Sequence, residues 1–352
     1  MKVLEKEVMP GLVNFPVLVT GASGFLGAGV VRSLLQRGFS NIRCLVRPSS
    51  SLTRLKEAIS EAKAGDKITI REGNLLSRDV CSDISRDVVL VFHLAAGTGT
   101  KSFSDAYLNS VVTTRNLLDA LLEWGDLRRF VSVSSFSVYT NCGKPRRRVL
   151  DESCPVESHP ESRAEAYCFG KVKQDELLIE YALKRELPLV IVRPGNIFGP
   201  GKSSIPGRVG IEPFGIYFHF GGSNKIPLTY IDNCAEAVVL SGIVPGIEGQ
   251  IFNIVDDDLP SSRHFLKLYK KSVRDFKSVY IPHILSYLFC LIWEGFANRS
   301  KGQLPPVYTR REWHATWKRT MFSNKKLKEM TEWAPAVPME EAIEKFMRSA
   351  RL

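Results

Sequence analysis

The sequence predicts an α/β protein built on a doubly wound parallel sheet, and three observations support this prediction. Short apolar runs that suit buried strands alternate with helical patterns through residues 14–195. A glycine-rich turn follows the first of these runs. Beyond residue 195 the alternation gives way to loops rich in glycine and proline. We therefore expect a nucleotide-binding domain over residues 14–195 and, over 196–352, mostly a smaller C-terminal substrate-binding lobe.

The elements follow in order along the chain. Strands are predicted at 16–20, 41–46, 68–70, 88–94, 130–133 and 189–192, and helices at 25–35, 51–64, 104–124 and 164–185. Helical connections between successive strands require the strands to run parallel, with helices on both faces of the sheet. A further strand near 250–255 is expected to return to the main sheet, so the second half is not wholly a separate lobe.

Composition excludes several classes of protein. With 44% apolar and 24% charged residues, the chain is neither disordered nor collagen-like. Lysine and arginine exceed aspartate and glutamate by 11, which favours anionic partners. The excess is scattered and accompanies no recognised nucleic-acid-binding module, so we expect a small-molecule substrate and no nucleic acid.

Cysteine and histidine usage bears on location and on metal binding. The seven cysteines are an odd number without C-x-x-C spacing, which favours a reducing compartment. The six histidines show no ligand spacing, so no metal site is expected. The charged residues 1–7 do not resemble a signal peptide. A cytoplasmic protein is the expectation, with membrane association as an alternative because of one apolar segment.

That apolar segment is residues 281–293, which are almost entirely aliphatic and aromatic. Thirteen residues containing a proline and a histidine fall short of the ~20 that span a bilayer. We expect a helix buried in the lobe. The alternative is a helix that lies on a membrane surface and makes a peripheral contact there.

The glycine turn predicts a dinucleotide site. Gly21, Gly24 and Gly27 form a G-x-x-G-x-x-G pattern between the first strand and the first helix. Such glycines permit a tight turn, a close approach of backbone to pyrophosphate, and close packing of the helix on the sheet. In this context near the chain start the pattern is typical of a Rossmann-like fold.

The end of the second strand predicts which dinucleotide binds. NAD-binding proteins carry a carboxylate there that holds the ribose 2′-hydroxyl. Here Val46 occupies that place and Arg47 follows, whose guanidinium suits a phosphate. We therefore expect a preference for NADP(H), with NAD(H) as the alternative. Ser23 in the turn is a further candidate contact.

Several segments resemble one known family, the extended short-chain dehydrogenases/reductases of the NAD-dependent epimerase/dehydratase-like group. The resemblance covers nearly all of the chain. Its motifs are the glycine turn and the segments 93–96, 109–118, 134–139, 167–171 and 193–201. The run 281–293 and the segment 322–327 are similar to the tail of the 3β-hydroxysteroid dehydrogenase-like branch.

The resemblance implies a set of cofactor contacts beyond the turn and Arg47. Asn74 replaces the family's aspartate beside adenine, and an amide there still offers a donor and an acceptor. The predicted cofactor-binding residues are Gly21, Ser23, Gly24, Phe25, Leu26, Gly27, Arg47, Asn74, Leu75, Leu94, Ala95, Ala96, Tyr167, Lys171, Pro194, Asn196 and Ile197.

The predicted catalytic residues are Ser135, Tyr167, Lys171 and Asn109. Tyr167 and Lys171 are four residues apart, so they share one face of a helix. A lysine charge near the phenol would lower the tyrosine pKa and allow proton exchange with a substrate oxygen. By resemblance, Ser135 rather than Ser134 binds that oxygen, and Asn109 helps to position Lys171 through water.

Three features favour redox chemistry over sugar-nucleotide chemistry. Phe136 and Ser137 stand where dehydratases of the family carry an Asp-Glu pair. The segment 225–233 lacks the arginine that binds a sugar-nucleotide diphosphate. The tail resembles steroid dehydrogenases. We expect an oxidoreductase that interconverts a hydroxyl and a ketone on a sizeable, partly apolar substrate by hydride transfer.

Two other functions remain open from the sequence. A nucleotide-sugar 4-epimerase uses the same Ser-Tyr-Lys site, so the resemblance alone does not exclude it. A non-catalytic cofactor sensor is a third reading, although such sensors commonly lose the tyrosine or the lysine. The helices at 104–124 and 164–185 resemble a pair that dimerises many relatives, which makes a homodimer an expectation by analogy.

Overall fold

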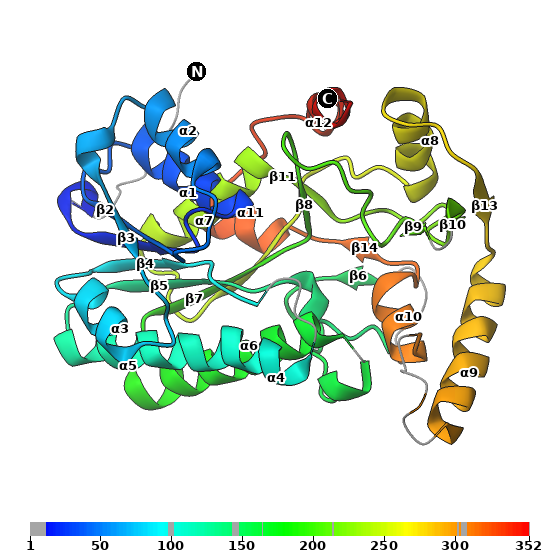
Figure 1. Ribbon diagram of the computed structural model, residues 1–352, viewed down its shortest axis with the longest axis horizontal. Helices are drawn as coiled ribbons and strands as arrows, with labels where there is room; N and C mark the ends of the chain where they lie inside the picture. The colour runs from blue at the N-terminus through cyan, green and yellow to red at the C-terminus, as the bar shows by residue number, and fades with distance from the viewer. Residues whose placement is uncertain are drawn as a thin grey trace.

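The computed structural model describes residues 12–97, 102–142, 148–163, 165–212, 215–300, 303 and 308–351. Its centre is a seven-stranded sheet in the order β12-β7-β5-β4-β1-β2-β3, and all of its strand pairs are parallel (Figure 1). The strands are β1 (Val17–Thr20), β2 (Ile42–Val46), β3 (Ile68–Glu72), β4 (Leu90–His93), β5 (Arg129–Val133), β7 (Leu189–Pro194) and β12 (Ile251–Ile254). The order reverses between β1 and β4, which opens a crevice at the carboxyl ends of these strands.

Helices cover both faces of this sheet, which confirms the predicted doubly wound fold. On one face lie α1 (Phe25–Gln36), α2 (Thr53–Glu61), α7 (Ile231–Ile243) and α11 (Lys325–Thr331). On the other lie α3 (Arg78–Ser85), α4 (Phe103–Tyr107), α5 (Thr113–Trp124) and α6 (Ala166–Arg185). Each face has its own apolar cluster, because side chains alternate between the two faces of every strand.

The rest of the second half forms a lobe beside the carboxyl edge of the sheet (Figure 1). Its strands are β8 (Asn196–Phe198), β9 (Gly210–Ile211), β10 (Tyr217–His219), β11 (Leu228–Tyr230), β13 (Ser278–Tyr280) and β14 (Met321–Phe322), which pairs with β6 (Val149–Leu150). Its helices are α8 (Ser262–Ser272), α9 (His283–Arg299), α10 (Arg310–Thr316) and α12 (Met339–Ala350). Because α7, α11 and β12 join the nucleotide-binding layers, the division at residue 195 stays a prediction.

Two local features were not predicted. Helix α3 is short, and the Ser77 hydroxyl caps it by accepting from the Val80 amide. The helix predicted at 104–124 contains a π-helical turn at Leu108–Val112 between α4 and α5. Such turns occur often at functional sites, and this one carries Asn109.

The expectation that residues 281–293 are buried is wrong. They lie in β13's connection to α9 and in α9 itself, whose large side chains face outward. Ile284, Ile292 and Phe296 expose 67%, 57% and 61% of their surface. The side of α9 that faces the protein carries Ser286, Cys290 and Ala297, and Tyr287 packs there against an aromatic cluster that includes Trp313, so the aliphatic side chains point away from the protein. Within the residues described, no helix has the length and apolar character needed to cross a membrane.

Candidate active site

A cavity of about 510 Å³ lies at the carboxyl edge of the main sheet. The ends of β1, β2, β4, β5 and β7 surround it, together with the first turns of α1 and α6. All but one of the predicted site residues line it, so the fold brings together segments that lie far apart in the sequence. The structure adds Leu45, Val46, Ser50, Gly73, Thr113, Val133, Ser134, Gly195 and Lys202.

The exception is Asn196, which does not line the cavity. Its neighbours Gly195 and Ile197 do. Side chains alternate along a strand, so a register that turns Ile197 toward the cavity turns Asn196 away. Binding of the cofactor by Asn196 stays a prediction.

The glycine turn is shaped for a ligand that approaches backbone. Gly21 has a φ of 69°, and a Cβ there would lie 3.0 Å from the amide nitrogen of Ala95. A Cβ on Gly27 would collide with the carbonyl oxygen of Gly21. No side chain caps α1 after Gly24, so its first amides face the cavity with the positive end of the helix dipole.

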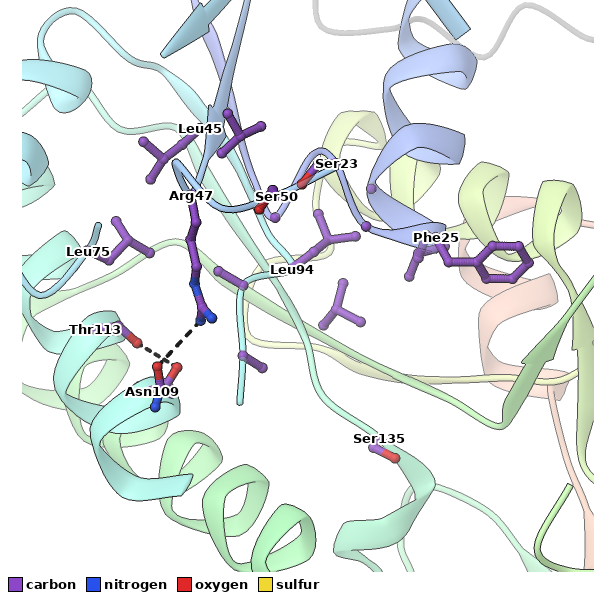
Figure 2. Close-up of a pocket in the computed structure, with 18 of the residues that line it drawn as sticks. Ser23, Phe25, Leu45, Arg47, Ser50, Leu75, Leu94, Asn109, Thr113 and Ser135 are labelled. Carbon is purple, nitrogen blue, oxygen red and sulfur yellow. Dashed lines mark hydrogen bonds between the residues drawn. The ribbon is translucent and has the colours of Figure 1, made fainter. Parts of the chain in front are cut away.

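The charged side chains described around the cavity are all cations. Arg47, Lys171 and Lys202 line it, and no aspartate or glutamate is among the described lining residues. Figure 2 shows Arg47 reaching across the cavity toward Asn109, whose Oδ1 lies 3.5 Å from an Arg47 nitrogen. Ser23 and Ser50 lie near the start of this side chain. The glycine turn, the N-terminus of α1 and these cations together suit the phosphates of a dinucleotide.

Sequence reasoning missed two cations near the turn. Lys202 follows β8, and its Nζ lies 4.9 Å from the centroid of the Phe25 ring. Arg54 of α2 lies 5.6 Å from the same centroid and donates to the Gly201 carbonyl at 3.0 Å. Both come from segments without a recognisable phosphate-binding pattern, so only the fold places them beside the N-terminus of α1.

The two serines after β5 have different surroundings. Ser134 donates to the Asp175 Oδ2 at 3.0 Å and is fully buried. The Ser135 Oγ accepts from the Ser137 amide at 3.1 Å and lines the cavity, where a hydrogen bond with Tyr167 helps to stabilise the phenolate. Ser135 is therefore the serine whose hydroxyl is not held by a carboxylate, and its role in binding a substrate oxygen stays a prediction.

The electrostatics of the tyrosine differ from the expectation. Burial raises the pKa of Tyr167 to about 12, more than its hydrogen bond with Ser135 opposes. Burial also lowers the pKa of Lys171 to about 8, although the charge of Asp175 counteracts this. The Lys171 ammonium donates to the Val133 carbonyl at 2.6 Å and to the Gln174 Oε1 at 2.9 Å. The predicted lowering of the tyrosine pKa is not found in this structure, because desolvation by burial exceeds the opposing effect of the Ser135 hydrogen bond.

A buried hydrogen-bonded chain connects this lysine to the glycine turn. The Gln174 Nε2 donates to the Thr114 Oγ1 at 2.8 Å, and that hydroxyl donates to the Ser110 carbonyl. The His93 Nε2 lies 2.9 Å from the same oxygen, and its Nδ1 lies 2.9 Å from the Thr20 Oγ1. The Thr114 oxygen thus accepts from His93, which assigns the proton to Nε2 and makes Nδ1 an acceptor.

This assignment requires a neutral histidine, and its surroundings supply one. Burial, with the nearby Lys171 charge, lowers the pKa of His93 to about 3. The Thr20 hydroxyl then donates to His93 and accepts from the Ala95 amide at 3.2 Å. Every link has a donor and an acceptor, so the chain fixes Lys171, the end of β4 and the end of β1 relative to one another.

Asn109 contacts neither end of this chain. Its Nδ2 donates to the Asp105 carbonyl at 3.0 Å and to the Asp105 carboxylate at 2.8 Å. It lines the cavity opposite Arg47. Gln174 is the side chain that contacts Lys171, and a role for Asn109 acting through water stays a prediction.

We predict that Gln174 sets the alkaline limb of the pH profile. That limb should lie near pH 8, where Lys171 loses its charge. Gln174→Glu should move the limb upward by about one unit, because a carboxylate stabilises the ammonium. Gln174→Met removes the acceptor and should move it downward. The measurement is the initial rate of cofactor turnover between pH 6 and 10, and an unmoved limb in both variants would contradict this role.

Comparisons with known proteins agree with these features. Residues 17–254 match the profile of the NAD dependent epimerase/dehydratase family. A 3beta-hydroxysteroid-dehydrogenase/decarboxylase of Arabidopsis thaliana is 26% identical, over 94% of this chain and 79% of the relative. A trifunctional UDP-glucose 4,6-dehydratase/UDP-4-keto-6-deoxy-D-glucose 3,5-epimerase/UDP-4-keto-L-rhamnose-reductase of the same plant is also 26% identical, over 68% of this chain. The chain spans only 36% of that enzyme's length.

The fold is also found among solved structures. The UDP-glucuronic acid 4-epimerase of Bacillus cereus, solved in complex with NAD, superposes with a TM-score of 0.70. The match covers 96% of this chain and 98% of the epimerase, at 20% sequence identity. At that identity the likeness establishes the architecture and leaves the reaction to the site residues.

Proposed function

Because the chain belongs to the NAD dependent epimerase/dehydratase family, we propose that it is an NAD(P)-dependent enzyme of the extended short-chain dehydrogenase/reductase type. On this premise we propose that it is an NADP(H)-dependent oxidoreductase that interconverts a hydroxyl and a ketone on a sizeable, partly apolar substrate. The observation that carries the proposal is the cavity, which has Ser135, Tyr167, Lys171 and Arg47 among its lining residues.

Each side chain has a distinct task in this reaction. The bound nicotinamide supplies or accepts the hydride. Ser135 holds the substrate oxygen, and Tyr167 donates a proton to it during ketone reduction. A phenol with a pKa of about 12 keeps its proton throughout the neutral range. Lys171, held by Gln174 and Val133, places its charge beside the site and stabilises the phenolate that forms.

Several observations support redox chemistry over dehydration. Phe136, which follows Ser135, is buried and stacks on Phe322 with ring centroids 5.8 Å apart. No acid therefore follows Ser135 to protonate a leaving hydroxyl. The segment 225–233 contains no arginine to bind a diphosphate, and its one lysine, Lys225, donates to the Leu259 carbonyl. The steroid dehydrogenase relative matches 94% of the chain, including the substrate lobe.

The test is a screen of the purified protein with ketones, alcohols and UDP-sugars, followed by absorbance of the reduced cofactor. Net oxidation or reduction of cofactor with a ketone or an alcohol is the expected result. Interconversion of UDP-sugars without net change in absorbance would instead establish a nucleotide-sugar 4-epimerase. Cofactor binding without turnover of any class would favour a sensor.

We also predict which cofactor binds more tightly. Arg47 follows β2, no carboxylate is among the described residues that line the cavity, and Ser23 and Ser50 line it as well. A charge-assisted hydrogen bond to a 2′-phosphate contributes roughly 1.5–3 kcal/mol. Arg47→Ala should therefore reduce the preference for NADPH over NADH by about 10- to 100-fold.

The measurement is titration of both cofactors by tryptophan fluorescence or calorimetry. Arg71→Ala is the matched control, because Arg71 lies on the neighbouring strand β3, is exposed, and does not line the cavity. It should leave the ratio unchanged. If the wild-type protein binds NADPH no better than NADH, the proposed cofactor preference is wrong.

A further inference from the structure

The outer side of α9 is an apolar surface without a charged side chain along most of its length. Its only acid, Glu294, pairs with Arg310 of α10, with Oε2 and Nε 2.7 Å apart. A cation appears only in the last turn, at Arg299. The exposed apolar residues are Ile284, Leu285, Leu288, Phe289, Leu291, Ile292 and Phe296, and we call them the α9 face. Contiguous exposed patches of this kind mark interaction sites.

The fold holds the α9 face outward. On the inner side, the small residues Ser286, Cys290 and Ala297 are buried. The Ser286 Oγ accepts from the Trp313 Nε1 of α10 at 2.9 Å, and Tyr287 packs edge-on against the Trp313 ring. These contacts fix the rotation of α9 about its axis. The outward direction of its aliphatic side chains is therefore part of the folded structure.

A basic segment precedes α9 in the chain. The segment 263–280 contains the cations Arg263, Lys267, Lys270, Lys271, Arg274 and Lys277 and the single acid Asp275. Helix α8, strand β13 and helix α9 follow one another along one side of the molecule (Figure 1). The Arg263 guanidinium lies 5.4 Å from the centroid of the Tyr280 ring, which connects the first turn of α8 to the end of β13.

Part of this charge is free to meet a partner. Lys270 and Arg274 form ion pairs with Asp275 and Glu212. Arg263, Lys267 and Lys271 are exposed, and none of the ion pairs found among the described residues includes them. An apolar helix face beside unpaired cations is complementary to a bilayer that carries anionic headgroups.

We propose that the α9 face and the α8 cations bind the surface of an anionic lipid bilayer. With 17 residues, α9 is about 26 Å long and lies on the membrane rather than across it. A second copy of the chain is a poorer partner, because a two-fold contact pairs a surface with itself. This surface is apolar and basic, so it lacks the acids that would complement it.

A series of contacts leads from α9, through α10, to the segment that follows Ser135 in the active site. Helix α10, which fixes α9, also carries Glu312, whose carboxylate pairs with the buried Arg163. Arg163 in turn donates to the Ser137 carbonyl, two residues after Ser135. Membrane binding is measured without turnover, so its test stands apart from the proposed reaction.

The experiment is sedimentation of the full chain with vesicles of phosphatidylcholine alone or with a quarter of phosphatidylglycerol. The wild-type protein should pellet with the mixed vesicles and be released as salt rises. Leu288→Asp should reduce the bound fraction about tenfold or more. Val149→Asp is its matched control, because Leu288 and Val149 expose 43% and 45% of their surface, and it should bind as the wild type does.

A second pair of variants tests the α8 cations. Its result stands even if Leu288→Asp impairs folding. Lys267→Glu with Lys271→Glu should weaken binding to the mixed vesicles by tenfold or more. Lys56→Glu with Lys63→Glu makes the same change in net charge around α2 and should have little effect. Equal losses in both double variants would overturn the proposal. So would a wild-type protein that ignores anionic vesicles, or a dimer in velocity sedimentation that Leu288→Asp dissociates.

Discussion

Tyr167→Phe should lower the rate of cofactor turnover by about 10²- to 10⁴-fold, the loss typical of removing a general acid. The variant keeps the ring that lines the cavity and removes only the proton that the substrate oxygen receives. Cofactor affinity should change little, because the phosphate-binding glycine turn and Arg47 are untouched. The measurement is the initial rate with the substrate that the screen identifies, together with a cofactor titration.

Tyr107→Phe is the control for this variant. Tyr107 belongs to α4, is exposed, and packs near Phe169 without lining the cavity. Its hydroxyl can be removed without touching the site, so turnover should stay near the wild-type rate. A Tyr167→Phe enzyme with normal turnover would show that another group delivers the proton.

The parts of the site that the sequence predicts are those that depend on residues close together in the chain. The roles of Gly21 and Gly27 follow from their spacing within one turn. Tyr167 and Lys171 lie on one helix face because they are four residues apart, independently of the rest of the fold. Arg47 follows directly from the end of a buried strand. Such features need only the secondary structure to be correct, and the strands around the cavity were predicted to within a few residues.

The remaining features depend on contacts between distant residues. His93 meets Thr20 across 73 positions and Thr114 across 21, and Gln174 meets Thr114 across 60. No spacing rule connects these residues, so the sequence predicts no role for His93, and only the family resemblance predicts that Asn109 positions Lys171. The pKa of Tyr167 was likewise predicted from one neighbour, whereas burial by the whole fold determines it.

The outward face of α9 has a similar explanation. Hydrophobicity indicates that a segment avoids water, but it does not say which surface covers it. The side of α9 that faces the protein is determined by Trp313, which lies 27 residues after Ser286, donates to its hydroxyl and packs against Tyr287. Apolar character therefore predicted the helix correctly and its burial incorrectly.

The largest effect on stability should come from Asp175→Ala. Asp175 and Arg193 are both buried, with Oδ2 and the guanidinium 2.9 Å apart, and the same oxygen accepts from Ser134. Removing the carboxylate leaves the guanidinium without its counter-charge in the interior. Such a loss typically costs about 3–5 kcal/mol of unfolding free energy. For a chain of this size we expect a midpoint of thermal unfolding lower by roughly 4–7 °C.

A double variant separates the cost of an unpaired charge from the value of the pair. Asp175→Ala with Arg193→Met removes both charges and should recover part of the lost stability. Glu176→Ala is the control, because Glu176 is the residue after Asp175 in α6. Its ion pair with Lys173 is exposed and contributes little to stability. Because the charge of Asp175 also raises the pKa of Lys171, the single variant should move the alkaline limb of turnover downward. An Asp175→Ala protein as stable as Glu176→Ala would show that Arg193 finds another partner. The buried pair would then not be the contact that holds β7 against α6.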